Sequence, residues 1–239
     1  MKTTLLQNSH SKGTYISDEL RELLKSIGNI RPLVKGTYVF NEGEDSHEIY
    51  IVKKGLVQIS KMTPEGKELI LRICKENDMF GELTLFSEDA KYLLNSKVLS
   101  PGEMYVINKE QLELALQTNS KLTLEYLKWT SNHMRKLQMK MRDLLMIGKR
   151  GALYSTLIRL SNSYGVDQED GKLINIPLTN SELAKFCATT RESVNRILND
   201  LRKKGIITIR SNKILLKDIE FLRTGIGCEN CPIEICNIN

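Results

Sequence analysis

The sequence predicts an α+β protein with an N-terminal antiparallel β-barrel or jelly roll, a long helix, and a C-terminal winged helix-turn-helix. Three observations predict this order. Short alternating runs broken by regular glycines fill residues 31–118, as is typical of small antiparallel barrels. Residues 119–147 have apolar side chains at the spacing of an amphipathic helix. Residues 148–217 contain two helix-start signals close together, as two short helices joined by a tight turn require.

Composition favours a globular protein. The chain has 239 residues, 41% of them hydrophobic and 27% charged, which gives room for two modest domains. It lacks the apolar run of about 20 residues that a membrane span needs, and its opening residues are too polar for a signal peptide. We therefore expect a cytoplasmic protein with no membrane partner, whose five cysteines are thiols or metal ligands rather than disulfides.

The positive charge is concentrated in one segment. Residues 148–217 contain 13 Lys and Arg against 6 Asp and Glu, whereas residues 1–147 contain 21 against 19 and residues 218–239 contain 1 against 4. A local positive field of this kind suits a polyanion such as nucleic acid. The alternative is a solvated basic face without a ligand.

Residues 1–30 contain a polar lead-in and a short helix. Apolar side chains recur there at helical spacing, and a glycine follows as a stop signal. These residues are Leu20, Leu23, Leu24, Ile27 and Gly28.

Residues 31–108 alternate with the period of β-strands. Val57 and Ile59 are separated by Gln58, and the run ELILRIC places Leu69, Leu71 and Ile73 on one face. Residues 63–66, TPEG, predict a hairpin turn. A helix from Lys109 to about Gln117 should follow the strands. The glycines expected at the corners are Gly36, Gly43, Gly55, Gly66 and Gly81.

The long helix, from about Lys121 to Ile147, has one apolar stripe with the spacing of a coiled-coil seam. We expect this seam to form a homodimer, although an amphipathic helix packed only within its own domain is the alternative. The seam residues are Leu127, Thr130, Met134, Leu137, Met141 and Leu144. The flanking residues expected in water are Lys128, Arg135, Lys136, Lys140 and Arg142.

Two capping boxes mark the helix-turn-helix. In each of the segments 179–182 and 189–192 a threonine stands three residues before a glutamate, so the two side chains can satisfy free backbone N–H groups reciprocally. The first helix should end near Cys187. The expected shared core is Leu183, Ala184, Phe186 and Cys187 against Val194, Ile197, Leu198 and Leu201.

The outer face of the second helix has side chains that can read bases. Guanidinium groups donate twice to guanine, a carboxylate accepts from cytosine, and an amide pairs with adenine. The alternative is a solvated face in which Glu192 serves only its cap. The candidate DNA-binding residues on this helix are Thr190, Arg191, Glu192, Asn195, Arg196 and Asn199. Two strands around Ser211 and Asn212 then predict a wing, whose Arg210 and Lys213 could contact phosphates.

The chain ends in a cysteine motif. Cys228, Cys231 and Cys236 follow the pattern C-x2-C-x4-C, and thiolates suit iron–sulfur clusters or zinc. One ligand is missing locally, because a four-iron cluster needs one ligand per iron. A zinc knuckle, free or oxidised thiols, and a disordered tail are the alternatives.

The remaining cysteines and the histidines are weaker candidates for the fourth ligand. Cys74 ends a predicted strand and Cys187 belongs to the predicted core, where a thiol behaves as a small hydrophobe. His10 lies in the lead-in and His47 in a loop, which leaves His133, on the long helix, as a possible ligand.

A glycine-rich barrel, a long dimer helix and the segment RESVNRIL together resemble the Crp/Fnr family of bacterial transcription regulators, over almost the whole chain. The resemblance implies a cyclic-nucleotide-binding-like barrel, a homodimer that reads a double-stranded DNA palindrome, and RNA polymerase as a further partner. The reading positions of the family map onto Arg191, Glu192, Asn195 and Arg196. The two arginines are similar to those of members that read TGTGA half-sites, whereas Asn195 stands where the family has glycine or serine.

The resemblance does not extend to cyclic AMP. Members that sense this nucleotide have an arginine and a hydroxyl residue after a Gly-Glu-Leu stretch, to hold the cyclic phosphate. Here Gly81-Glu82-Leu83 is followed by FSEDAKYLLN, whose only cation is Lys91. A lysine lacks the two-pronged fork that pairs with phosphate, so we expect no cyclic AMP.

The tail resembles that of the Fnr oxygen sensors of Bacillus. This implies one [4Fe-4S] cluster per chain, held by Cys228, Cys231, Cys236 and an aspartate of the long helix. The matching residue is Asp143, in KMRDLL. Its alternative is an exposed carboxylate paired with Lys140 or Arg142.

Together these observations predict a homodimeric, oxygen-responsive transcription regulator for anaerobic genes, and not an enzyme. One alternative keeps DNA binding but makes the tail a structural zinc site, with another effector for the barrel. A second alternative is an iron–sulfur redox protein or enzyme. The sequence offers it neither a nucleophile with a partnered base nor a phosphate-cradling glycine loop.

Overall fold

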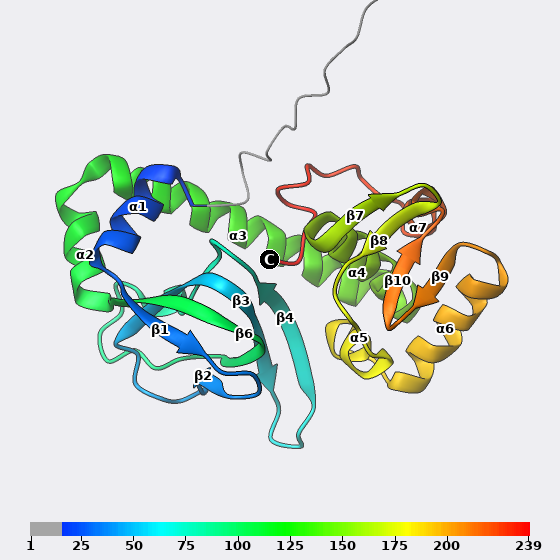
Figure 1. Ribbon diagram of the computed structural model, residues 1–239, viewed down its shortest axis with the longest axis horizontal. Coiled ribbons are helices and arrows are strands. Elements are labelled where there is room, and N and C mark those ends of the chain that lie inside the picture. Colours follow the sequence, from blue (N-terminus) through cyan, green and yellow to red (C-terminus); the bar gives the residue numbers. More distant parts are fainter. Residues whose placement is uncertain (1–15) are drawn as a thin grey trace, which may run out of the picture.

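The computed structural model describes residues 16–239, and it confirms the predicted fold class. A β-domain and a C-terminal domain lie side by side, and one long helix runs behind the β-domain to reach the C-terminal domain (Figure 1). Residues 1–15, which include His10 and half of the predicted lead-in, lie outside the described residues. No helix within residues 16–239 has the length and apolar character that crossing a membrane requires.

The β-domain is an antiparallel sheet of six strands in the order β1-β6-β3-β4, with β2 added to β6 and β5 added to β3. Its core contains stacked aromatic rings, among them Phe40 and Tyr92, whose centroids lie 3.9 Å apart. A 3-10 turn, Glu82–Thr84, follows β5. The strands are β1 Asn29–Leu33, β2 Tyr38–Phe40, β3 Glu48–Met62, β4 Glu68–Cys74, β5 Met79–Phe80 and β6 Asn95–Asn108.

Two of the predicted corner glycines, Gly66 and Gly55, have different roles in the sheet. The predicted hairpin turn is confirmed, since the Gly66 N–H donates to the Thr63 carbonyl at 2.9 Å and Gly66 has a φ of +80°. Gly55 lies instead inside β3, so that two predicted runs form one long strand. Its φ is +108°, and a Cβ there would lie 2.8 Å from the Ser100 carbonyl oxygen. The register of β3 against β6 shifts on both sides of this position, and the close backbone approach there needs glycine.

The predicted alternation in β3 and β4 is only partly right. Gln58 is buried, and so are its apolar neighbours Val57 and Ile59. In β4, Ile70 and Ile73 are both buried, whereas Leu69 and Leu71 are half-buried. Two causes combine: the β3–β4 register shifts at Ile59, and the C-terminal domain covers the outer face of β4. A strand buried on both sides loses its clean period.

Three helices join the β-domain at the positions that the sequence predicts. They are α1 Asp18–Ile27, α2 Lys109–Thr118 and α3 Ser120–Met146. The Ser17 hydroxyl caps α1 by accepting from the Leu20 N–H at 3.3 Å. The first half of α3 packs on the β-domain through Leu122, Tyr126 and Trp129.

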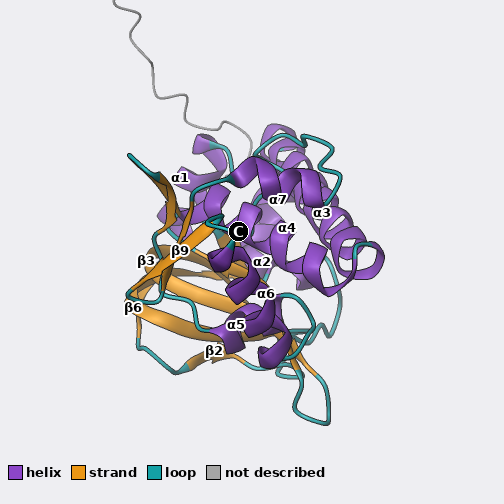
Figure 2. Cartoon of the chain, turned by 90° about the vertical axis from the view of Figure 1, so that its right-hand side faces the viewer, coloured by secondary structure: helices purple, strands orange, loops and turns teal. Residues whose placement is uncertain are grey.

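The C-terminal domain contains the predicted helix-turn-helix and wing. Figure 2 views it from the side of α5 and α6. The wing turns at Ser211 and Asn212, both with positive φ, as a two-residue hairpin requires. Its small sheet has the order β7-β8-β10-β9. The elements are α4 Gly148–Tyr164, β7 Gly165–Gln168, β8 Gly171–Ile174, α5 Asn180–Phe186, α6 Arg191–Lys203, β9 Ile207–Arg210, β10 Lys213–Leu216 and α7 Ile219–Gly225.

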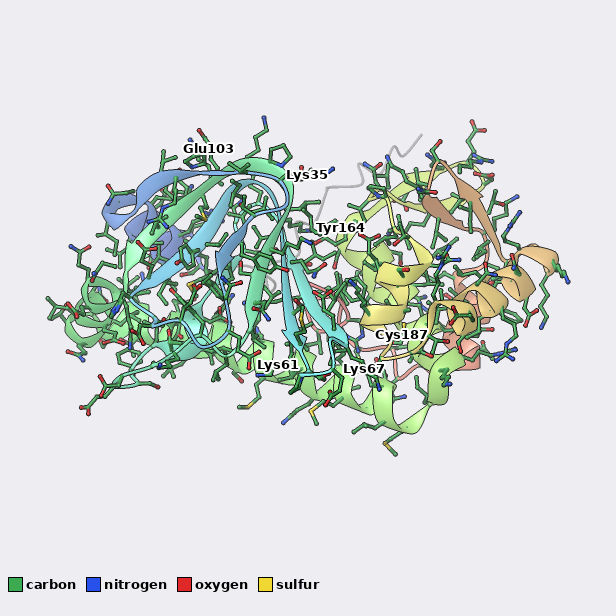
Figure 3. The ribbon with its side chains drawn as sticks, turned by 90° about the horizontal axis from the view of Figure 1, so that it is seen from below. Lys35, Lys61, Lys67, Glu103, Tyr164 and Cys187 are labelled. Atoms are coloured by element: carbon green, nitrogen blue, oxygen red, sulfur yellow. The ribbon has the colours of Figure 1, made fainter. Side chains whose placement is uncertain are left out.

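The two domains touch along β4. Lys185 of α5 forms an ion pair with Glu68 of β4 at 2.7 Å. The Tyr164 hydroxyl at the end of α4 donates to the Ile73 carbonyl at 2.6 Å, and Figure 3 shows Tyr164 at this junction. The C-terminal domain is therefore docked on the sheet rather than tethered by a linker alone.

Candidate functional site

Side-chain caps set the start of the candidate recognition helix, α6. The first predicted capping box is confirmed: the Thr179 N–H donates to Glu182 at 2.7 Å, and the Glu182 N–H donates to the Thr179 hydroxyl at 3.2 Å. The second box is wrong by one residue. Thr190, not Thr189, caps α6, because its hydroxyl accepts from the Ser193 N–H at 3.3 Å.

This shift gives Glu192 a local role at the helix start. It occupies the second helical position, where hydrogen bonds from its own N–H and from Thr190 lower the pKa of its carboxyl group. The carboxylate therefore stays ionised near the positive end of the helix dipole.

The two faces of α6 are clearly divided. Its inner face, which includes Val194 and Leu198, packs on the predicted partners in α5. Cys187 is buried there, and burial raises the pKa of its thiol to about 11, so it is an inert core residue as predicted. The outer face exposes Arg191, Glu192, Asn195 and Arg196, with Asn199 half-buried.

The arrangement of the outer face suits base reading. The exposed guanidinium groups of Arg191 and Arg196 lie five residues apart on α6. A carboxylate and an amide, the other groups that read bases, lie beside them. Asn195 already accepts a hydrogen bond from the Asn180 amide at 3.1 Å, so α5 restrains its orientation. The wing cations are also held within the chain: Arg210 pairs with Asp170 at 3.1 Å, and Lys213 donates to Asn175 at 2.7 Å.

The predicted seam of α3 is largely exposed in the single chain. Leu127, Met134, Leu137 and Met141 are each between 50 and 62% exposed. Leu144 differs, because it is half-buried against the core of the C-terminal domain in the same chain.

Lys136 and Lys140, expected in water, are both buried. Lys140 donates to the carbonyls of Ile70 and Leu71 at 2.8 and 2.9 Å. One face of α3 packs against the two domains of its own chain, and the seam occupies another face. The face left for charged side chains in water is therefore narrower than the pattern predicts.

A cavity of about 390 Å³ lies between the β-domain and α3. Arg72 of β4, which the sequence analysis did not identify, makes two 2.9 Å hydrogen bonds to the Glu82 carboxylate inside it. Lys91 lies instead on an exposed bridge, 3.7 Å from Asp45. The available signal for Arg72 was an arginine within the apolar run LILRIC, residues 69–74.

The cysteine tail folds back onto α3. Arg142 of α3 pairs with Glu229 of the tail at 2.8 Å, and all three tail thiols are half-buried. The pKa of the Cys236 thiol is raised by burial, opposed by the charge of Arg159, and raised further by Cys228, Cys231 and Asp143. Cys236 is therefore close enough to the other three predicted ligands for their charges to act on its thiol. Among residues 16–239, however, no group of three His, Cys, Asp or Glu side chains is arranged to hold a metal ion.

Asp143 is only 5% exposed, so the alternative of an exposed carboxylate is wrong. Arg159 of α4 pairs with it at 2.8 Å, and the Ser155 hydroxyl donates to the same carboxylate oxygen. Within residues 16–239, the partners of these two predicted cations lie elsewhere: Arg142 pairs with Glu229, and Lys140 donates to backbone carbonyls.

The sequence analysis missed Ser155 and Arg159. A signal was present, because Ser155, Arg159 and Asn162 recur four and three residues apart along α4, which places them on one face of the helix. Arg159 also donates to the Ile235 carbonyl at 3.1 Å, which connects Asp143 to the residue before Cys236.

His133 occupies a different environment from the tail thiols. Its ring lies 4.0 Å from that of Trp129 and lines the cavity. Burial holds its pKa well below 6.5, so the ring is neutral at physiological pH.

Known families and proteins match both domains of the chain. Residues 30–119 match the cyclic nucleotide-binding domain, and residues 151–224 match the Crp-like helix-turn-helix domain. The chain is 58% identical to the anaerobic regulatory protein of Bacillus subtilis, over 96% of this chain and 97% of that one. It is 29% identical to the global nitrogen regulator of a Nostoc species, over 74% and 79%. In structure it is similar to a CooA mutant from Carboxydothermus hydrogenoformans, with a TM-score of 0.73, 20% identity, and coverage of 88% of this chain and 95% of that one.

Proposed function

Because this chain belongs to the Crp/Fnr family of DNA-binding transcription regulators, we propose that it controls anaerobic genes in response to oxygen through a [4Fe-4S] cluster. The observation that carries the proposal is the return of the cysteine tail to α3, where Arg159 bridges the buried Asp143 and the carbonyl before Cys236. The 58% identity with a protein named for anaerobic regulation supports the same function.

The donor set fits such a cluster in its chemistry. Cys228, Cys231 and Cys236 would supply three soft thiolates and Asp143 a hard carboxylate, one ligand per iron. Bound there, the cluster would supply oxygen-sensitive redox chemistry. The tail thiols must move closer together to bind, because they are not gathered in the described arrangement.

Arg159 has a defined role in the protein without a cluster. Its guanidinium neutralises Asp143, which would otherwise be an unpaired buried charge costing several kcal/mol. Arg159 and Ser155 bond to the Oδ2 atom of Asp143, so Asp143 could become a ligand through Oδ1 while Arg159 keeps both this partner and the Ile235 carbonyl. Asp143 is thus held ready near the tail while its charge is compensated.

DNA recognition would follow the division of α6. Arg191 and Arg196 would donate to guanines of a TGTGA-type half-site, Glu192 would accept from a cytosine, and Asn195 and Asn199 would supply amides. Thr190, at the start of the helix, would contact the backbone, as would Arg210 and Lys213 after exchanging their internal partners for phosphates.

Family members act as dimers, and the exposed α3 stripe fits a second copy of the chain. We place the dimer seam on Leu127, Thr130, Met134, Leu137 and Met141, with Leu144 at its edge. Two recognition helices would then read a palindrome, and RNA polymerase is the partner through which binding would alter transcription.

The cavity argues against cyclic AMP as the effector. Glu82 of the Gly-Glu-Leu stretch is already paired with Arg72 on both oxygens. A cyclic phosphate would have to compete with the Glu82 carboxylate for the Arg72 guanidinium, and giving up that buried ion pair is strongly unfavourable. We therefore assign the signal to the tail rather than to the cavity.

The decisive measurement is iron, acid-labile sulfide and zinc per chain after strictly anaerobic purification, with operator binding before and after air. We expect about four irons and four sulfides per chain, and operator binding that weakens in air. Zinc without sulfide, together with binding that is indifferent to air, would overturn the proposal and favour a structural zinc tail.

Variants test the ligand assignment. Asp143→Ala should lower cluster content or speed its loss in air, and Cys231→Ser should do the same without disturbing the buried Asp143–Arg159 pair. Glu125→Gln is the matched control, because it removes a carboxylate from the same helix, one that pairs only with Lys128 among the ion pairs of the described residues. Retention of a full, oxygen-sensitive cluster in Asp143→Ala would exclude Asp143 as a ligand.

A further inference from the structure

The last five residues of the described chain are unusually buried for a tail. Ile235, Asn237, Ile238 and Asn239 are all buried, and Cys236 is half-buried. Asparagine is mostly exposed in folded proteins unless it is hydrogen-bonded. The Asn237 amide donates to the carbonyls of Ile233 and Glu234 within the tail, whereas the Asn239 amide has a partner outside it.

One set of partners belongs to α4. Arg159 donates to the Ile235 carbonyl at 3.1 Å, and the Asn162 amide donates to the Cys236 carbonyl at 2.6 Å. The Ile238 N–H donates to the Ser163 hydroxyl at 2.9 Å. These bonds fix the backbone on both sides of the Cys236 side chain.

A second set belongs to the β-domain and α3. The Ile73 N–H of β4 donates to the Ile238 carbonyl at 3.3 Å, and the Asn239 amide donates to Asp78 at 3.2 Å. Lys136 of α3 donates to the Asn239 carbonyl at 2.8 Å. Figure 1 shows this end of the chain at the junction of the two domains.

Ile238 joins the two sets of contacts. It is 3% exposed and belongs to the same apolar cluster as Ile70 and Ile73 of β4 and Ile158 of α4. Its side chain therefore fills space between the domains, while its N–H and carbonyl bond to opposite sides.

We propose that residues 235–239 form a strut that positions Cys236 and connects it to α4, β4 and α3, so that movement of Cys236 changes the docking of the C-terminal domain on the β-domain. Only the claim that a cluster drives this movement rests on the proposed function. The strut itself is a property of the reduced, metal-free chain.

The physical basis is that backbone contacts on both sides of Cys236 hold the segment on α4, while the Ile238 carbonyl also accepts a hydrogen bond from β4. Cys236 cannot shift toward Cys228 and Cys231 without straining its bond to Asn162 or carrying Ile238 with it. Displacing Ile238 opens the apolar cluster that holds α4 on β4. Packed interfaces of this kind switch between discrete arrangements rather than deform smoothly.

The first test compares alkylation of thiols in the reduced, metal-free protein by mass spectrometry. Ile238→Ala should raise the alkylation rate of Cys236 at least tenfold relative to Cys228. Ile233→Ala is the matched control, because Ile233 lies in the same tail but is 56% exposed, and should leave the ratio unchanged. Ile238→Val should restore most of the protection.

Cys187 reports unfolding in the same experiment, because it is buried in the core of the C-terminal domain. If Ile238→Ala also exposes Cys187, then Asn162→Ala replaces it, since that variant removes the amide bonded to the Cys236 carbonyl. Equal Cys236 rates in the wild type and in the deciding variant would overturn the strut.

The second test asks whether movement is transmitted. Alkylation of Cys236 with a bulky maleimide should speed hydrogen exchange at the Ile73 amide and along α5, whereas alkylation of Cys228 should not. Identical exchange after either modification would refute the coupling. Neither test involves iron, so failure of the strut and failure of the iron analysis are separate results.

Discussion

Lys140 is a buried cation without a carboxylate among its hydrogen-bond partners. Burial lowers its pKa to about 7, and the nearby charges of Cys187, Arg159 and Asp143 modify it further. A lysine amine can donate hydrogen bonds in either protonation state, so the bonds to the Ile70 and Leu71 carbonyls can persist as the proton is lost. The folded pKa lies below the ordinary value of 10.5, so the unfolded chain binds more protons between these values. The contribution of Lys140 to stability therefore increases as pH rises through this window.

We expect the unfolding free energy of the reduced, metal-free protein to rise between pH 7 and 8.5, with Lys140 contributing about 1–2 kcal/mol. Lys140→Met should remove its share of that rise, whatever it does to absolute stability, and Lys136, whose pKa burial lowers to about 8, should still contribute a smaller rise. Urea denaturation at fixed protein concentration measures the slope. Lys128→Met, on the exposed side of α3, should leave the slope as it is, and the same slope in all three proteins would contradict the assignment.

At the scale of elements, signals that act within a few residues were predictable. The Thr179 box, the wing turn and the starts of α2 and α3 depend on neighbouring residues, and the sequence predicts them correctly. The cap of α6 was displaced by one residue because two adjacent threonines offer the same signal, and only the observed backbone bond to Ser193 distinguishes them.

Contacts between distant segments were not predictable. Arg159 meets Asp143 and Ile235 across 16 and 76 residues, and nothing local specifies either partner. The burial of Lys136 and Lys140 likewise depends on the docked C-terminal domain. The sequence could place Asp143 near the tail only through a resemblance. The structure adds Arg159, which is the counter-ion of Asp143 and also bonds to the Ile235 carbonyl of the tail.

The exposed stripe of α3 gives a test of dimerisation. Leu137→Glu should place a charge in the seam and convert the dimer to monomer at micromolar concentration, because burying an unpaired carboxylate is strongly unfavourable. Sedimentation measures the change. Leu124→Glu is the matched control, since Leu124 is also exposed on α3 but lies outside the predicted seam. Loss of the dimer in both variants, or in neither, would place the interface elsewhere.

On the scale of the whole molecule, α3 connects three separate contacts. Its first half is packed on the β-domain, its seam faces outward, and its last turns hold Asp143 and the tail. The Lys185–Glu68 pair, the Tyr164 hydroxyl and residues 235–239 then fix the C-terminal domain on β4. The sequence predicted the type of each domain. It did not predict how the domains dock, because the docking depends on individual contacts between residues far apart in the chain.

Such docking should make the spacing of the two recognition helices in a dimer stiff, and operator geometry tests this. Inserting two base pairs between the half-sites rotates one by about 70° and moves it by about 7 Å. We expect operator affinity to fall at least tenfold, measured by fluorescence anisotropy at constant salt. The monomeric Leu137→Glu variant should bind both operators equally weakly, since it engages one half-site at a time. A wild-type protein that tolerates the insertion would show that the C-terminal domains move independently, whatever the contacts along β4.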